Sequence, residues 1–95
     1  MRTIKRASQF KTDYRQIKAN PRHASDIDSL FGAIVTLLAT DQPLPEQYRD
    51  HDLVGDWRGH RECHVKPDLL LIYSRPDADT LRLVRLGSHS NLFKK

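Results

Sequence analysis

The sequence predicts an α+β fold in which an N-terminal helical hairpin packs on a small antiparallel sheet. Two observations carry this prediction. Apolar residues recur at helical spacing before residue 40, and short apolar runs separated by turn residues follow residue 60. The chain has 95 residues. That length fits a single domain spanning residues 1–95, which would bury roughly 60–70% of the surface of the unfolded chain.

The first half contains a candidate short strand and two helices. Residues 3–6 can form a short strand, and Ser8 is a candidate cap for a helix that ends where Asn20 precedes a proline. Ser25 or Asp26 can cap a second helix whose wide apolar face, over residues 27–38, makes it the core helix.

The second half predicts a loop followed by strands. Prolines, a glycine and many polar residues make 41–59 a long loop, and loops of this length are commonly functional. Strands are expected over 61–65, 69–73 and 80–86, joined by short turns into an antiparallel meander. The apolar run at 69–73 is typical of a central strand covered on both faces.

Composition limits the function classes. The formal charge of +4 and the pI of about 9.5 favour an anionic partner such as nucleic acid or an acidic protein. A single cysteine, Cys63, excludes an internal disulfide and a cysteine-built zinc site, which suits a reducing cytoplasm. The chain has no apolar leader and no run of about 20 apolar residues, so we expect no membrane partner.

Histidines in the second half indicate acid–base chemistry on a polyanion. Cleavage of RNA by attack of its 2′-hydroxyl needs a general base, a general acid and cations that stabilise the phosphate. An aromatic ring can in addition hold a nucleobase by stacking. Histidine exchanges protons near neutral pH. The candidate proton-transfer groups are His51, His64, Asp68 and His89, and the candidate substrate-binding groups are Arg61, Arg85 and Phe93.

The order of short motifs in this half resembles the YafQ toxins, a branch of the RelE-like bacterial toxins. The motifs are Asp50-His51, Gly55-Asp56-Trp57-Arg58-Gly59, Arg61, His64-Val65, Pro67-Asp68, Leu71-Ile72-Tyr73, Gly87-Ser88-His89 and Leu92-Phe93.

The resemblance implies a RelE-like fold and a toxin of a type II toxin–antitoxin system. Such a toxin enters the ribosomal A site, cuts messenger RNA without a metal or cofactor, and is silenced by a co-expressed antitoxin. It also implies that His51 and Asp68 handle the 2′-hydroxyl proton and His89 serves the leaving group. His64 would position the phosphate, which Arg85 stabilises, and Phe93 would orient a base. Leu69 departs from the family pattern, which has an aromatic residue there.

Other interpretations remain open. Each histidine can be an ordinary surface residue, Asp68 a common Pro-Asp turn residue, and Phe93 an anchor of the C-terminus. The chain as a whole can be a non-catalytic basic binding module, or a degenerate toxin that only binds its antitoxin.

Overall fold

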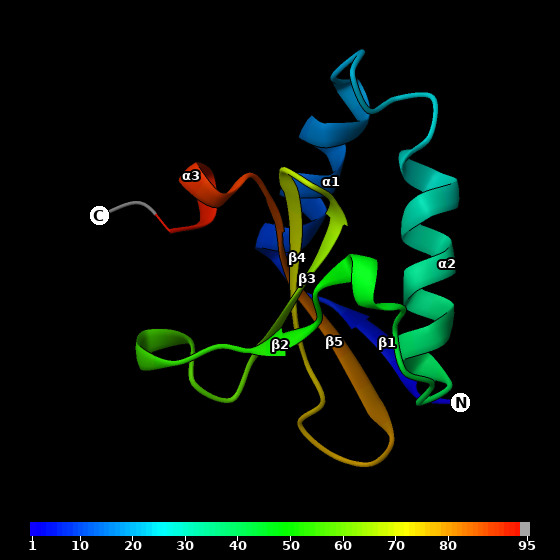
Figure 1. Ribbon diagram of the computed structural model, residues 1–95, viewed down its shortest axis with the longest axis vertical. Helices are drawn as coiled ribbons and strands as arrows, with labels where there is room; N and C mark the ends of the chain where they lie inside the picture. The colour runs from blue at the N-terminus through cyan, green and yellow to red at the C-terminus, as the bar shows by residue number, and fades with distance from the viewer. Residues whose placement is uncertain (94–95) are drawn as a thin grey trace.

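The computed structural model describes residues 1–93, with helices packed against a five-stranded sheet (Figure 1). The predicted helices and strands are all present. Short elements also form within the segment expected to be a loop and at the C-terminal end. In chain order the elements are β1 (Thr3–Arg6), α1 (Ser8–Ala19), α2 (Ile27–Ala39), the 3-10 turn η1 (Glu46–Tyr48), β2 (His51–Asp52), the 3-10 turn η2 (Gly55–Trp57), β3 (Arg61–Lys66), β4 (Leu69–Ser74), β5 (Thr80–Gly87) and α3 (His89–Leu92).

The sheet has the order β1-β5-β4-β3-β2. Strands β3, β4 and β5 form the expected antiparallel meander, and β2 extends it antiparallel to β3. Strand β1 instead pairs in parallel with β5, with Thr3 opposite Thr80 and Arg6 opposite Leu83. The sheet is therefore mixed rather than wholly antiparallel. No local sequence pattern could report this pairing, because the two strands lie near opposite ends of the chain.

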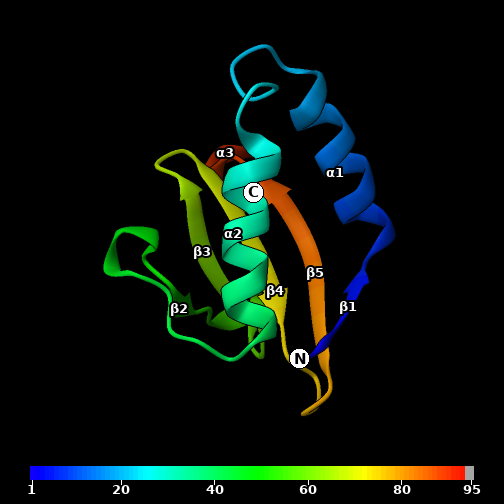
Figure 2. The same cartoon turned by 90° about the vertical axis from the view of Figure 1, so that its right-hand side faces the viewer.

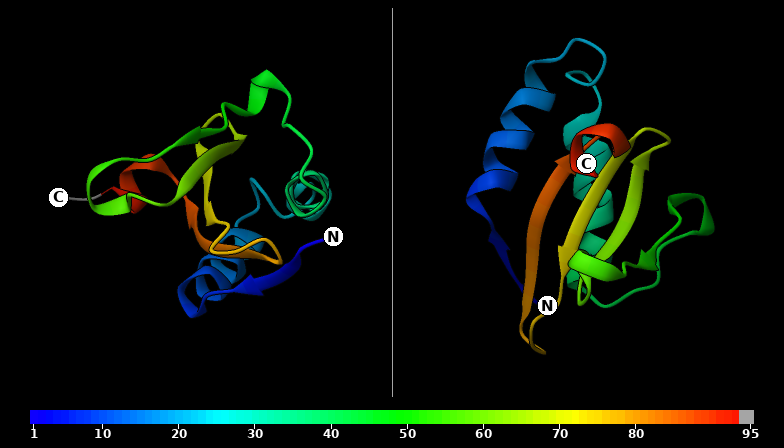
Figure 3. Two further views of the ribbon diagram at one scale, coloured as in Figure 1. Left: turned by 90° about the horizontal axis from the view of Figure 1, so that it is seen from below. Right: turned by 90° about the vertical axis from the view of Figure 1, so that its left-hand side faces the viewer.

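The central strand β4 is buried on both faces, as its apolar run indicated. On one face, Leu69, Leu71 and Tyr73 join the main core formed with the helices. On the other face, Leu70 and Ile72 form a second cluster with side chains from the 41–59 segment, β5 and the C-terminal end. Figure 2 shows α2 crossing the first face, and the right panel of Figure 3 shows α3 at the end of the second.

Helices α1 and α2 form the predicted hairpin and are joined by aromatic contacts. The rings of Phe10 and Phe31 stack with centroids 5.5 Å apart, and the hydroxyl of Tyr14 donates to Asp28. Within residues 1–93, no helix is long and apolar enough to span a membrane.

The helix starts differ in detail from the predicted caps. Ala7, not Ser8, occupies the cap position of α1, because the Ala7 amide still continues the sheet by donating to the carbonyl of Leu83. Asp26 occupies the cap position of α2, but its carboxylate makes no capping bond. It pairs instead with Lys66, 2.8 Å away, and so ties the interhelical connection to the end of β3.

A buried carboxylate closes the edge of β5 beyond the end of β1. Asp13 of α1 is 6% exposed and accepts a hydrogen bond from the backbone amide of Leu86 at 3.0 Å. It also accepts from Arg85 through Nε at 2.7 Å and Nη2 at 3.3 Å. One side chain therefore satisfies a free strand amide and fixes α1 on the sheet.

We expect Asp13→Ala to lower the free energy of unfolding by about 2–4 kcal/mol, because it leaves the Leu86 amide and the Arg85 guanidinium without their partner. Urea denaturation measures the change. Gln16→Ala, an exposed change on the same helix, should stay within about 0.5 kcal/mol. A loss equally small for Asp13→Ala would show that this contact does not hold α1 in place.

Candidate active site

The second face of the sheet brings two of the predicted histidines to one buried carboxylate. His51 on β2 lies opposite Glu62 on β3, and His64 lies two residues further along β3 on the same face. The Nε2 atoms of His51 and His64 are 3.9 Å and 3.6 Å from Glu62 Oε1. The Glu62 side chain is only 6% exposed, and within residues 1–93 it makes no other ion pair. The two histidines and this carboxylate are called the His–Glu–His cluster below.

Backbone carbonyls orient both imidazoles of the cluster. Nδ1 of His51 lies 2.7 Å from the carbonyl oxygen of Arg49, and Nδ1 of His64 lies 3.2 Å from that of Pro67. Each ring can therefore donate Nδ1–H to a carbonyl and turn Nε2 toward Glu62. This geometry leaves Nε2 as the nitrogen that can exchange a proton.

Sequence reasoning missed Glu62, although a signal for it was present. Cys63 is buried in the main core, so alternation along β3 turns Glu62 and His64 together to the other face. In the sequence, Cys63 separates Glu62 from the candidate catalytic His64. Because Cys63 points into the core, this spacing predicts that Glu62 and His64 share the opposite face.

Helix α3 presents His89 next to Phe93. The Ser88 hydroxyl caps the helix by accepting from the amide of Asn91 at 3.2 Å. Gly87 lets the helix fold back closely, because a Cβ there would meet the Leu92 side chain at 3.3 Å. The rings of His89 and Phe93 lie 4.9 Å apart, and His89 is exposed.

Phe93 also contacts the 41–59 segment. Its ring makes an edge contact with Trp57 at 6.4 Å and packs on the second cluster. Trp57 therefore joins the loop to the C-terminal segment. The partly buried Phe93 anchors the chain end and leaves part of its ring accessible.

Asp68 lies in the turn between β3 and β4, at the edge of a cavity of about 510 Å³. The cavity also reaches Ser88 and Asn91, so Asp68 shares it with the start of α3. His64 lines a different cavity, of about 370 Å³, with Tyr48 and Arg49. The two cavities share Lys66 and Pro67, so His64 and Asp68 lie along adjoining hollows near the start of α3 rather than in one enclosed pocket.

Arg61 lies elsewhere. It alternates with Glu62, and its guanidinium contacts Asp50 at 3.1 Å, Asp52 at 2.6 Å and the hydroxyl of Tyr73 on the main-core face. Burial opposes its charge, but the hydrogen bonds to Asp50 and Tyr73 outweigh this and raise its pKa. Because Asp50 and Asp52 contact its guanidinium, Arg61 holds the loop on β3. Phosphate binding by Arg61 stays a prediction.

Arg85 lies near α3 but is held by Asp13. Together with Gly87 and Asn91 it lines a small cavity of about 230 Å³ between α1 and α3. Its side chain remains 25% exposed. Leu69 is fully buried in the main core, so this departure from the family pattern contributes packing rather than a surface ring.

Comparison with known proteins identifies the family of the chain. Residues 2–94 match the family described as bacterial toxin of type II toxin–antitoxin system, YafQ. The chain is 39% identical over 92 residues to the mRNA interferase toxin YafQ of Escherichia coli K12, covering 97% of this chain and 96% of the relative. The chain belongs to the YafQ family of type II toxins.

Solved structures of YafQ-related toxins confirm the α+β, RelE-like fold. A metal-bound toxin from Helicobacter pylori superposes with a TM-score of 0.87 at 46% identity, covering 98% of this chain and 100% of that one. The E. coli DinJ–YafQ complex superposes with a TM-score of 0.82 at 37% identity, covering 98% and 99%. Bound metal is a property of the H. pylori structure. Within residues 1–93 of this chain, no three histidine, cysteine or acidic side chains are arranged to hold a metal ion.

From the buried Cys63 and Tyr73 of the main core we predict a loss of stability at alkaline pH. Burial raises the pKa of Cys63 from 9.0 to about 12, and burial followed by the bond to Asp50 raises that of Tyr73. Above about pH 9 the unfolded chain loses the thiol proton while the folded chain keeps it. The free energy of unfolding should therefore fall as pH rises toward about 12. Urea titrations should show a shallower fall for Cys63→Val, and an unchanged fall would contradict this origin.

Proposed function

We propose that this toxin is an mRNA interferase that cuts messenger RNA on the ribosome by attack of the 2′-hydroxyl on the adjacent phosphate. The observation that carries the proposal is the His–Glu–His cluster. Within residues 1–93 the buried Glu62 carboxylate pairs only with the imidazoles of His51 and His64, an arrangement of acid and base groups that suits proton transfer. The name of the 39% identical E. coli relative supports the same reaction class.

Apart from Arg61, each predicted residue takes a role in this proposal. Asp68 and His51 serve the 2′-hydroxyl, and one of them receives its proton as the 2′-oxygen bonds to phosphorus. The bond to the 5′-oxygen then breaks, and His89 gives that oxygen a proton. His64 positions the phosphate and Arg85 stabilises its charge. Phe93 and the His89 ring beside it hold a nucleobase. The products are a 2′,3′-cyclic phosphate, or the 3′-phosphate formed from it, and a 5′-hydroxyl.

The proposed reaction needs the ribosome and mRNA as partners and takes place in the cytoplasm. The basic surface supports the RNA partners, since the chain carries a formal charge of +4. A cognate antitoxin is the third partner, and the solved DinJ–YafQ complex of E. coli supports this assignment. A non-catalytic binding module and a degenerate toxin remain the competing functions.

The first test is inducible expression in a bacterium, with primer extension on a reporter mRNA. We expect wild type to arrest growth and create new 5′ ends within codons. His89→Gln should lower cleavage at least about 100-fold, because it removes the acid. Ser90→Ala, an exposed neighbour on α3, should cut normally. Arrest by both wild type and His89→Gln without new ends would favour a binding module, and no arrest by wild type would favour a degenerate toxin.

Glu62→Gln tests the cluster itself. It keeps the shape of the side chain but removes the charge that faces both imidazoles. We expect cleavage by translating ribosomes in vitro to fall about 10- to 100-fold, chiefly in kcat, with partial recovery in Glu62→Asp. Glu46→Gln, an exposed change in η1, is the matched control. Wild-type kcat in a folded Glu62→Gln protein would remove Glu62 from the mechanism.

A further inference from the structure

The cavity of about 510 Å³ that Asp68 lines, called the Asp68 cavity below, adjoins the residues proposed for catalysis. The end of α1 and the interhelical connection form one wall of it, the β3–β4 turn forms a second, and the start of α3 forms a third. Its volume lies within the range of pockets that hold small organic ligands. Three segments that are distant in the sequence therefore build a hollow for which the proton transfers described above need only Asp68.

Asn91 of α3 lines both the Asp68 cavity and the cavity of about 230 Å³ that contains Arg85. Asp68 is proposed to serve the 2′-hydroxyl, and Arg85 is proposed to stabilise the phosphate. His89 lies two residues before Asn91 on the same short helix. Asn91 therefore adjoins the groups proposed for both reacting parts of one nucleotide.

The carboxamide of Asn91 is free to bind a ligand. The backbone amide of Asn91 donates to Ser88 Oγ at 3.2 Å, but within residues 1–93 its exposed side chain has no hydrogen-bond partner. Asn20 lines the cavity from the opposite wall, and its Oδ1 accepts from the Arg22 amide at 3.0 Å, which leaves its NH₂ group as a donor. The cavity thus offers a donor with an acceptor on one wall and a further donor on another.

Lys66 is occupied in joining the turn to the interhelical connection. Its ammonium nitrogen lies 2.8 Å from Asp26, 3.0 Å from His23 Nδ1 and 3.3 Å from the carbonyl oxygen of Arg22. Because an ammonium group only donates, Nδ1 of His23 accepts, and a neutral His23 carries its proton on Nε2. Burial, followed by the charges of Lys66 and Arg22, lowers the pKa of His23 and so keeps the ring neutral at pH 7.

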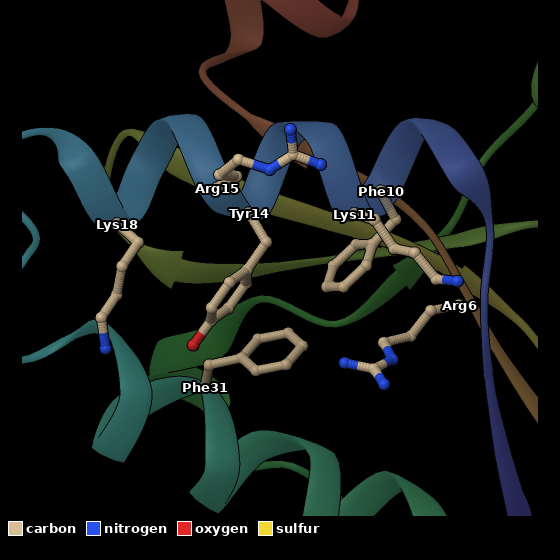
Figure 4. A pocket seen from close by; sticks show the side chains of 7 residues that line it. All are labelled: Arg6, Phe10, Lys11, Tyr14, Arg15, Lys18 and Phe31. Carbon is tan, nitrogen blue, oxygen red and sulfur yellow. The ribbon is translucent and has the colours of Figure 1, made fainter.

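The charges that line the Asp68 cavity nearly cancel. Asp26 matches Lys66 and His23 is neutral, so Arg22 and Asp68 remain as one cation and one anion. The groove between α1 and α2 is different, because four basic residues line it around three aromatic rings (Figure 4). A phosphate gains little in a cavity whose charges cancel and that contains a carboxylate. An uncharged nucleobase, which has hydrogen-bonding edges, suits the Asp68 cavity better.

We propose that the Asp68 cavity receives one nucleobase of the mRNA and that the Asn91 carboxamide recognises its edge. The inference rests on the proposed function and specifies the residue that sets its sequence preference. A carboxamide makes two hydrogen bonds to a base that presents the matching acceptor and donor, whereas a mismatched base leaves a polar group unpaired. Phe93 and the His89 ring hold a neighbouring base by stacking, which tolerates any base. Sequence preference then comes from Asn91 rather than from the rings.

The test uses brief induction of the toxin in a bacterium and sequences the new 5′-hydroxyl ends of all mRNAs. The frequency of each base is determined at every position around the cut. Asn91→Ala removes both hydrogen-bonding groups, and Asn91→Asp keeps the shape but can only accept. Ser90→Ala, on the same helix but outside the cavity, is the matched control. Thermal unfolding in a His89→Gln background, in which the protein can be produced, checks that each variant is folded.

We expect wild type to prefer one kind of base at one position beside the cut. Asn91→Ala should lower cleavage at preferred sites about tenfold relative to other sites, so that the preference disappears at this position alone. Asn91→Asp should shift the preference toward bases that donate, and Ser90→Ala should keep the wild-type profile. An unchanged profile in Asn91→Ala, or an equal loss of cleavage at all sites, would overturn the inference.

The inference and the proposed function fail in different ways. Wild-type cleavage with a profile that Asn91→Ala leaves unchanged would keep the nuclease and remove the base subsite. A wild-type protein that creates no new ends would overturn the nuclease and the subsite together. Arg22→Gln distinguishes a phosphate from a base in the cavity. An equal loss at all sites in Arg22→Gln, with an unchanged profile in Asn91→Ala, would make the cavity a phosphate site and overturn the inference.

Discussion

The burial of β4 on both faces is the constraint on which the rest of the structure depends. Its five consecutive buried residues require two covers, and α1 with α2 supply only one. The other cover comes from Leu53, Trp57, Leu92 and Phe93, in segments that also carry His51 and His89. Because this second cover is small, the histidines remain at its accessible rim. The need to bury one apolar strand therefore places the candidate chemistry beside this small second layer of packed side chains.

The two buried carboxylates, Asp13 and Glu62, have different partners and suit different roles. Asp13 is matched by a guanidinium and a backbone amide, so its charge is fully compensated and it serves to join α1 to β5. Within residues 1–93, Glu62 pairs only with the imidazoles of His51 and His64. This pairing supports the fold less than a guanidinium and a backbone amide do, but it brings together groups that can transfer a proton. The contrast is the physical reason to place the chemistry at Glu62 and the anchorage at Asp13.

Local patterns were sufficient for the helices and the meander but not for contacts between distant segments. The periodicity of 27–38 and the apolar run of 69–73 each describe one element, and both were predicted correctly. The role of Arg61 in holding the loop was not predicted, because its partners Asp50 and Asp52 reach it only after the loop folds along β3. The parallel pairing of β1 with β5 likewise joins segments that are distant in the sequence. Glu62 could have been found, since strand alternation alone places it beside His64.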